Sequence, residues 1–357
     1  MIATILRAYG ITSYNAEPLL SGLINRTWKV SSGEKDFILQ QINDQVFKNP
    51  RAIADNIRMV DEYLKEHNPG YLFVAPLTTV NNEDIFYADN LGYFRLLPFI
   101  DGSHTLNVVT KPEQAFEAAF QFGKFTRLLS GFNVAKLHIT IPDFHNLTLR
   151  FQQFEDALKN GNESRIKQSK FLIDNIKAHL DILTAFEKIQ ISAQVKQRAM
   201  HHDTKISNVL FNKEERGICI IDLDTLMPGY FISDVGDMLR TYLSPANEEE
   251  KDFGAIEVRD EVFRAIVNGY VSTMGDELTA EEQSLILYSG QFLIYMQAIR
   301  FLTDYLNNDI YYGARYEEHN FTRAGNQLSL LKNLEDKTKV FQEIVSKELQ
   351  NKHHLSS

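Results

Sequence analysis

The chain has 357 residues, of which 44% are hydrophobic and 24% are charged, and its formal net charge is -10. This composition excludes a disordered chain, and the length predicts two lobes or domains. The acidic charge argues against nucleic acid as a partner, because phosphate backbones bind basic surfaces.

The first hundred residues predict a small sheet and one helix. Residues 19–45 indicate a strand, a turn and a second strand. In residues 50–66, apolar side chains recur at spacings of three and four, and Pro50 suits a first helical turn. Three further segments are strand candidates because they are apolar and bounded by Asn and Gly: residues 71–80, 84–89 and 92–100.

The rest of the chain predicts a larger, mainly helical lobe. Thr110 and Glu113 can form a capping box, with Pro112 in the first turn of a long helix. Further helices are expected over 146–190, with a polar break at 159–164, over 260–306, and from Asn326 onward. Residues 201–235 are expected to be strand and loop. We therefore predict an α+β protein whose lobes meet near residue 100.

The predicted location is cytoplasmic. A signal peptide has a basic start and a long apolar core, and the N-terminal residues show neither. The most apolar long segment, Leu285 to Leu306, is interrupted by polar residues and predicts a buried helix and no membrane partner. The single cysteine, Cys219, leaves no pair for a disulfide or for zinc.

A polar stretch surrounds two apolar strands between residues 200 and 225. Asp203 and Asn208 lie before the first strand, and Asp222 follows the second strand. The intervening NKEERG is typical of a hairpin turn. If the strands pair, these three side chains lie at the same end of the hairpin.

Two carboxylates and an amide oxygen predict a magnesium site, since Mg²⁺ prefers hard oxygen ligands and retains substrate phosphates. A neighbouring carboxylate that is not bound to the metal can act as a base toward a hydroxyl. The alternative is that these residues only form turns. Against it stands the order H-x-D, four residues, N, and an apolar strand ending in Asp, which matches the kinase template for phosphoryl transfer.

The segments HHDTKISNVLF and CIIDLDT resemble the phosphotransferase motif of the aminoglycoside phosphotransferase and choline kinase superfamily, which has a protein-kinase-like fold. The D-T-K and I-D-L-D-T variants are closest to the N-acetylhexosamine 1-kinase group. Five other segments resemble that group in the same order: GLINRTWKV, FILQQINDQVF, IPDFHN, SDVGDMLR and RFLTDYL. The resemblance covers nearly the whole chain. It implies a nucleotide-binding lobe at residues 1–100 and a catalytic, substrate-binding lobe at 101–357.

The resemblance assigns roles to the residues of the central motif. Asp203 would be the base that takes the proton from an anomeric hydroxyl, and Asn208 and Asp222 would hold Mg²⁺ against the phosphates of ATP. His201 would support the catalytic loop from inside. Lys205 would contact the transferred phosphate, and the alternative for it is a solvated loop lysine.

Other polar residues near the motif are candidates for binding or support. Asp224 would bind sugar hydroxyls or assist the metal. Asp234 and Asp237 would brace the catalytic loop or cap the next helix. Arg300 and Asp304 lie four residues apart on one helical face and form either a simple ion pair or part of the sugar site. His145, in IPDFHN, is a substrate-binding candidate by resemblance, with a core-and-turn role as the alternative.

The nucleotide lobe departs from the kinase pattern. Gln40 and Gln41 occupy the strand where the phosphate-binding lysine is expected, and Asp55 could stand in for the helix acid. The candidate phosphate loop has one glycine, Gly22, so backbone amides and Asn25 or Arg26 are expected to assist it. The segment LLPFIDG would pass the adenine, which makes Leu97 and Phe99 nucleotide-binding candidates.

The leading hypothesis is an ATP- and Mg²⁺-dependent kinase that converts an N-acetylhexosamine to its 1-phosphate. The alternatives are a kinase of the same superfamily with an aminoglycoside, choline or amino alcohol as acceptor, and a nucleotide-binding pseudokinase. The missing strand lysine favours the pseudokinase, whereas the complete set of Asp203, Asn208 and Asp222 argues against it.

Overall fold

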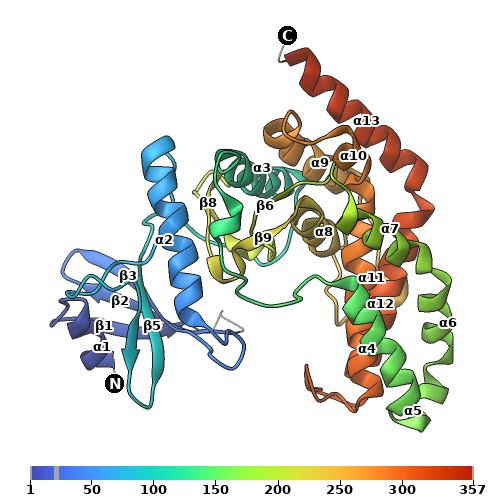
Figure 1. Cartoon of the computed structure of the whole chain (residues 1–357), viewed down its shortest axis with the longest axis horizontal. Helices are drawn as coiled ribbons and strands as arrows, with labels where there is room; N and C mark the ends of the chain where they lie inside the picture. Colours follow the sequence, from blue (N-terminus) through green and yellow to red (C-terminus); the bar gives the residue numbers. More distant parts are fainter. Residues whose placement is uncertain (1, 20–23, 356–357) are drawn as a thin grey trace.

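The computed structural model describes residues 2–19 and 24–355. It has a small N-terminal lobe built on an antiparallel sheet and a larger, mainly helical C-terminal lobe (Figure 1). The five strands of the sheet lie in the order β1-β2-β3-β5-β4. The elements of the small lobe are α1 (Ile2–Ala8), β1 (Asn15–Leu19), β2 (Arg26–Ser32), β3 (Lys35–Gln41), α2 (Pro50–His67), β4 (Phe86–Ala88) and β5 (Gly92–Pro98).

The two faces of this sheet have different roles because side chains alternate along each strand. One face is apolar and packs beneath α1, with a core made of Ile5, Leu6, Val30, Leu39, Phe94 and Leu96. The other face presents Gln40, Arg95 and Leu97 toward the C-terminal lobe, where Arg95 pairs with Asp224. This second face borders the space between the lobes.

Most of the expected elements of the small lobe are present, with one correction. The helix expected over 50–66 is α2, and Asn49 caps it by accepting a hydrogen bond from the Ala52 amide (3.3 Å). The strand expected over 71–80 is wrong. Pro76 has no amide hydrogen for a ladder, and only Leu77 forms an isolated bridge, to Leu96. Helix α1 and strand β1 were not expected.

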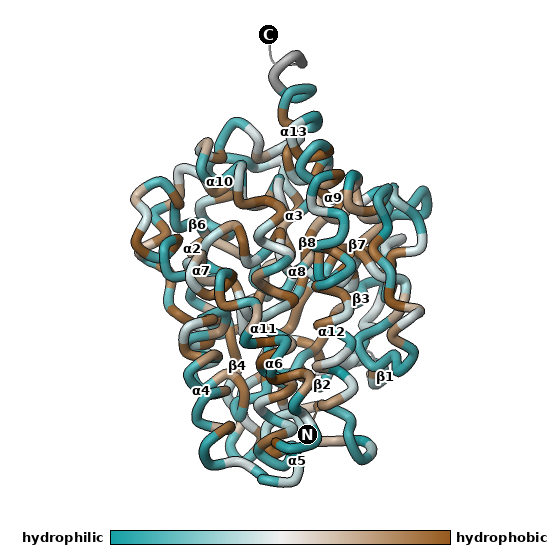
Figure 2. The backbone as a smooth tube through the Cα atoms, turned by 90° about the vertical axis from the view of Figure 1, so that its right-hand side faces the viewer, coloured by the Kyte–Doolittle hydropathy of each residue, from teal (hydrophilic) through white to brown (hydrophobic). Residues whose placement is uncertain are grey.

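The C-terminal lobe surrounds the buried helix α11 (Ile286–Leu306). Its other helices are α3 (Pro112–Leu128), α4 (Leu147–Asn160), α5 (Glu163–Gln168), α6 (Lys170–Ala178), α7 (Leu180–Ile191), α8 (Phe231–Tyr242), α9 (Asp260–Met274), α10 (Ala280–Ser284), α12 (His319–Asp336) and α13 (Thr338–Leu355). Four short strands form two pairs, β6 (Gln197–Met200) with β9 (Met227–Tyr230) and β7 (Val209–Phe211) with β8 (Gly217–Ile220). Hydrophilic residues dominate α5 and many outer loops (Figure 2). Within the described residues, none of the helices combines the length and hydrophobicity that a membrane span requires.

Three helical boundaries differ from the expectation. The cap of α3 uses Gln114 and not Glu113, because Gln114 Oε1 accepts from the amides of Thr110 and Lys111. Helix α8 begins at Phe231, inside the segment expected to be strand and loop. The C-terminal tail is two helices that start at His319 and Thr338.

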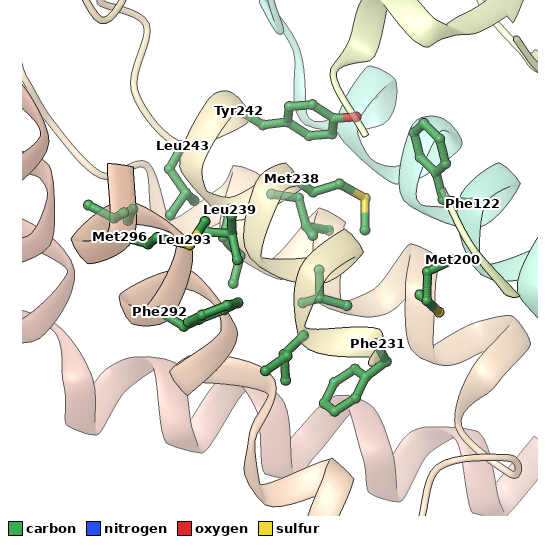
Figure 3. Close-up of a cluster of buried hydrophobic side chains, with 14 of the residues drawn as sticks. Phe122, Met200, Phe231, Met238, Leu239, Tyr242, Leu243, Phe292, Leu293 and Met296 are labelled. Carbon is green, nitrogen blue, oxygen red and sulfur yellow. The ribbon is translucent and has the colours of Figure 1, made fainter. Parts of the chain in front are cut away.

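Helix α8 forms a packed support behind the polar loop at residue 201. Met238 and Tyr242 of α8 lie in one buried cluster with Phe122 and Met200 (Figure 3). Gly236 allows α8 and α11 to touch, because a Cβ atom there would lie 2.3 Å from the carbonyl oxygen of Ser289. Close packing of this kind resists displacement, so the loop rests on a rigid base.

Candidate active site

The β7–β8 hairpin brings the polar residues together as the sequence predicts. Val209 lies opposite Ile220 in the β7–β8 pair, and the Ile221 amide donates to the carbonyl oxygen of Asn208 (2.9 Å). The loop before β7 and the turn after β8 therefore share one end. Asp203 lies close enough to Asp222 for its charge to act on the Asp222 carboxyl.

Asp203 and Lys205 form the most polar pair of the loop. Lys205 Nζ lies 3.1 Å from Asp203 Oδ2, and both side chains remain partly open to solvent. Burial opposes the charge of Lys205, but the carboxylates of Asp203 and Asp237 outweigh it and raise the pKa of the lysine. Lys205 is therefore a charged ammonium group beside the expected base.

Asn208 and Asp222 supply oxygen atoms suited to a hard cation. Asn208 Nδ2 donates to the carbonyl oxygen of Asp203 (2.8 Å), which leaves Oδ1 as the amide atom available to a metal. Asp222 has a left-handed backbone (φ 62°) and is open to solvent, although protein surrounds it on most sides. Desolvation by the surrounding protein, with the charges of Asp224 and Asp203, raises the pKa of Asp222. A divalent cation would relieve this repulsion.

These residues fit the way Mg²⁺ is usually bound in nucleotide enzymes. In that arrangement one or two protein ligands hold the ion, and substrate phosphates and water complete the shell. The described residues contain no group of three or more His, Cys, Asp or Glu side chains that could hold a metal alone. The donor set therefore suits a cation that arrives with a nucleotide and does not suit a closed structural site such as that of zinc.

His201 and two aspartates of α8 hold the loop in place. The buried His201 ring accepts from the Asp203 amide (3.3 Å) through Nδ1, so Nε2 carries the proton and donates to the Ile221 carbonyl (2.9 Å). Asp234 accepts from the amides of His201 (3.1 Å) and His202 (2.7 Å), and Asp237 accepts from the Thr204 amide (2.8 Å). Of the two roles expected for these aspartates, the structure shows bracing of the loop.

The nucleotide-binding candidates lie on or next to the sheet face that points toward the C-terminal lobe. Leu97 lies on the same sheet face as Arg95, opposite Ile38 of β3. Phe99 follows β5, its amide donates to the Asp36 carbonyl (3.2 Å), and Lys29 Nζ lies 4.5 Å from its ring centroid. Gly22 lies outside the described residues. For Leu97, Phe99 and Gly22, nucleotide contact stays a prediction.

A buried charge pair that sequence reasoning missed joins the two lobes. Arg95 Nη1 contacts Asp224 Oδ1, and Asn25 Nδ2 donates to Asp224 Oδ2 (2.7 Å). Both members of the pair are at most 4% exposed. The Asp224 carboxylate is thus bonded to the N-terminal lobe, and a contact with sugar hydroxyls stays a prediction. The sequence does contain one indication of this pair: Arg95 is a charged residue inside the apolar strand GYFRLLPF.

Comparison with known proteins identifies the family of this chain. The sequence matches the phosphotransferase enzyme family over residues 15–266, which is more than half of the chain. The chain belongs to the phosphotransferase enzyme family. It is a small-molecule phosphotransferase.

Solved structures share its fold at low identity. A microcompartment-associated aminopropanol kinase has a TM-score of 0.62 at 16% identity, covering 95% of this chain and 97% of its own. A spectinomycin phosphotransferase in complex with ADP and spectinomycin has a TM-score of 0.62 at 14% identity, with coverages of 94% and 97%. A choline kinase from Cryptosporidium parvum has a TM-score of 0.54 at 17% identity and covers 91% of both chains.

The phosphotransferase has a cavity of about 420 Å³ between α4, α11 and the segment that follows α11. Arg150, Arg300, Tyr311 and Tyr312 are among its lining residues. Arg300 donates to Gln297 (3.3 Å) and lies over the ring of Tyr312 (5.4 Å). The simple ion pair considered for Arg300 and Asp304 is not formed.

Asp304 lines the same cavity but also anchors its wall. Its two oxygens accept from the amides of Tyr311 (2.7 Å) and Tyr312 (2.9 Å), and Asn320 donates to Oδ2 (3.1 Å). The carboxylate thereby fixes the tyrosine segment. A direct contact of Asp304 with substrate stays a prediction.

His145 lies between this cavity and the catalytic loop. Its ring stacks on Phe144 (4.4 Å between centroids) and meets His202 edge to face (5.5 Å). Desolvation lowers the pKa of His145 well below its usual value, and the charges of His202 and Arg300 act in the same direction. The ring is therefore neutral near pH 7. Substrate binding by His145 also stays a prediction.

Proposed function

We propose that this phosphotransferase uses ATP and Mg²⁺ to phosphorylate the anomeric hydroxyl of an N-acetylhexosamine. The central motif resembles that of the N-acetylhexosamine 1-kinase group, and Asp203, Lys205, Asn208 and Asp222 lie together at the junction of the lobes. The observation that carries the choice of acceptor is the charge of the cavity beside α11.

That cavity is lined by two arginines without carboxylate partners. Neither Arg150 nor Arg300 forms an ion pair with any residue that the structure describes, and Asp304 is bonded to backbone amides. Burial and the charge of Arg300 lower the pKa of Arg150. The cavity also holds Asp156, Tyr311 and Tyr312, and carboxylates and aromatic rings favour cationic acceptors. We infer that the two unpaired arginines oppose this attraction and weaken the binding of an amine. They suit the hydroxyl and amide oxygens of a neutral sugar.

The cavity is linked to the catalytic loop through charged residues. The positive charges of Arg300 and Arg240 both contribute to lowering the pKa of His145. Arg240 in turn pairs with Asp237 (3.0 Å) and Glu248 (3.2 Å), and Asp203 contributes to its electrostatic surroundings. We therefore propose that a sugar bound at Arg300 reaches toward Asp203.

The residues divide the reaction among them. Asp203 accepts the proton of the anomeric hydroxyl as the sugar oxygen bonds to the terminal phosphorus of ATP, while the bond from that phosphorus to ADP breaks and ADP leaves. General base catalysis of this kind contributes about 100- to 10,000-fold. Lys205 offsets negative charge on the transferred group. Mg²⁺ held by Asn208 and Asp222 would neutralise the phosphates. The remaining acceleration comes from holding the two substrates in line.

The test is an acceptor panel with ATP and Mg²⁺, read as ADP release. The panel holds N-acetylglucosamine, N-acetylgalactosamine, glucose, galactose, choline, 1-amino-2-propanol and kanamycin. Turnover on the N-acetyl sugars alone, with loss of the reducing end, is expected, because only a 1-phosphate blocks that end. The methyl glycoside of N-acetylglucosamine is the matched control and should be inert. Turnover of that glycoside would contradict attack by the anomeric oxygen.

A second candidate is an amine-bearing acceptor, which the likeness to the aminopropanol and choline kinases favours. The same panel separates the two. Faster turnover of choline or the amino alcohol than of any sugar would replace the proposed acceptor and leave the assignments of Asp203, Asn208 and Asp222 in place.

A further inference from the structure

Strand β3 lacks a cation for the nucleotide phosphates. Its cleft-facing positions are Asp36, Ile38 and Gln40, because these alternate with Leu39, which lies in the apolar core beneath α1. Gln40 occupies the position where the strand lysine of typical kinases is expected. A neutral amide cannot offset phosphate charge.

Helix α2 also lacks an acid that faces the site. Asp55 lies on the outer side, where it pairs with Arg58 (2.8 Å) and lies near His138 (3.8 Å). The inward residue is Asn56, which is fully buried and donates to the carbonyl oxygens of His138 (2.9 Å) and Leu226 (2.8 Å). The usual lysine–glutamate pair between strand and helix is thus absent from both elements.

A different pair occupies the equivalent space. Arg95 of β5 lies directly opposite Gln40 in the sheet register, and Arg95 Nε donates to Gln40 Oε1 (2.8 Å). Arg95 Nη1 contacts Asp224, which lies two residues after the metal candidate Asp222. Arg95 Nη2 makes no hydrogen bond with a described residue, so the buried guanidinium keeps one amino group without a partner among them.

The position of Arg95 along β5 suits a phosphate. Leu97 and Phe99 follow it toward the connection between the lobes, where the adenine is expected. Phe99 lies four residues from Arg95, about 13 Å along an extended strand. At the other end, the charge of Arg95 acts on the Asp222 carboxyl. Arg95 therefore lies between the adenine region and the metal site.

We propose that Arg95 is the phosphate-binding cation of the nucleotide site, supplied by β5 in place of the strand lysine, and that Asp224 is the acid that positions it. This inference rests on the proposed use of ATP and is independent of the acceptor. A guanidinium can bind a carboxylate and a phosphate oxygen at once through different edges. The pair also joins the nucleotide lobe directly to the segment that carries Asp222.

The test compares the binding of ATP, ADP and adenosine by calorimetry, in the presence of Mg²⁺ and without an acceptor. In Arg95→Met, the dissociation constant of ATP should rise about 10- to 100-fold, as expected for a lost hydrogen bond to a charged group. Adenosine has no phosphates, so its dissociation constant should change less than about twofold. Arg58→Met, an exposed arginine of the same lobe, is the matched control and should change neither value.

A second variant separates phosphate binding from a purely structural link between the lobes. Asp224→Asn keeps the cation but removes its charge partner, so ATP affinity should stay within about threefold, while kcat falls because Arg95 is less well positioned. Equal weakening of ATP and adenosine in both variants would overturn the proposal, because the pair would then only join the lobes. Failure of the N-acetylhexosamine assignment would appear in the acceptor panel and leave these binding results unchanged.

Discussion

The ammonium nitrogen of Lys205 lies 3.1 Å from the carboxylate of Asp203, which precedes it by two residues on the same loop. The expected base and the expected phosphate-binding cation therefore form an ion pair. A bound phosphate would compete with the carboxylate for the ammonium group. Replacing Asp203 and replacing Lys205 should therefore change turnover to different extents.

Asp203→Ala should abolish measurable turnover, a loss of at least about 100-fold, because the attacking hydroxyl loses its base. ATP affinity should stay within about twofold of the wild type, since Asp203 is assigned no nucleotide contact. ADP release and calorimetry check the two values. Near-normal turnover would contradict the assignment.

Lys205→Met should lower kcat by about 10- to 100-fold, because a charge-assisted contact with the transferred phosphate is lost. Lys205→Arg retains the charge and should recover part of the rate. The comparison is made at saturating substrates. If Lys205→Met keeps the wild-type kcat, the lysine is a solvated loop residue, the alternative indicated by the sequence.

Arg300→Met should raise the KM of the acceptor at least about tenfold and leave the KM of ATP unchanged, because Arg300 lines the cavity proposed for the acceptor. Steady-state kinetics with each substrate varied in turn measures both values. Arg315→Met, an exposed arginine paired with Glu249 (3.1 Å), is the control. An unchanged acceptor KM in Arg300→Met would exclude this cavity as the acceptor site.

Asp234→Asn should lower the free energy of unfolding by about 1–3 kcal/mol, because the new amide NH₂ group faces a backbone N–H that the carboxylate had accepted. Turnover should fall as the loop moves. Urea unfolding provides the measurement. Asp252→Asn changes an exposed aspartate that also accepts from a backbone amide, that of Gly254 (3.0 Å), and should cost less. An equal loss of unfolding free energy in the two variants would show that Asp234 stabilises the fold no more than an exposed aspartate does.

His202 should make stability sensitive to acid. Burial lowers the pKa of its ring to about 4, whereas an unfolded histidine titrates near 6.5. The unfolded chain therefore binds a proton on His202 more readily than the folded protein does. The stability that the neutral ring provides is complete above pH 6.5 and is lost as the pH falls toward 4. The loss from this group should reach about 2 kcal/mol at pH 5.

The check is urea unfolding at pH 7.5 and pH 5, compared between the wild type and His202→Asn. The raised pKa values of Asp222 and Asp234 act in the opposite direction, and they largely cancel in this comparison. The variant should lose less stability on acidification than the wild type does. An identical loss in both proteins would show that His202 does not titrate on unfolding.

Short-range patterns predicted the catalytic half of the site. The β7–β8 hairpin follows from two apolar strands and a polar turn, and that hairpin alone brings Asp203, Asn208 and Asp222 to one end. The buried role of His201 likewise depends on local contacts with Asp203 and Ile221.

Long-range contacts explain what sequence reasoning missed. Arg95 and Asp224 are distant in sequence, and no local periodicity indicates their pairing. The start of α8 at Phe231 was missed because its first turn carries no capping side chain. The helical spacing of Arg300 and Asp304 predicts either an ion pair or part of the sugar site, yet the Asp304 oxygens accept from a segment that folds back from beyond the end of α11.

Asn56 fastens α2 to the C-terminal lobe through the backbone of His138 and Leu226. Helix α2 belongs to the small lobe by sequence, and Arg58 ties it to Asp84 of that lobe (2.7 Å). Because Asn56 also bonds to the backbone of the large lobe, α2 is a second connection between the lobes beside the pair of Arg95 and Asp224. Any separation of the lobes would therefore have to break polar contacts at two distinct places.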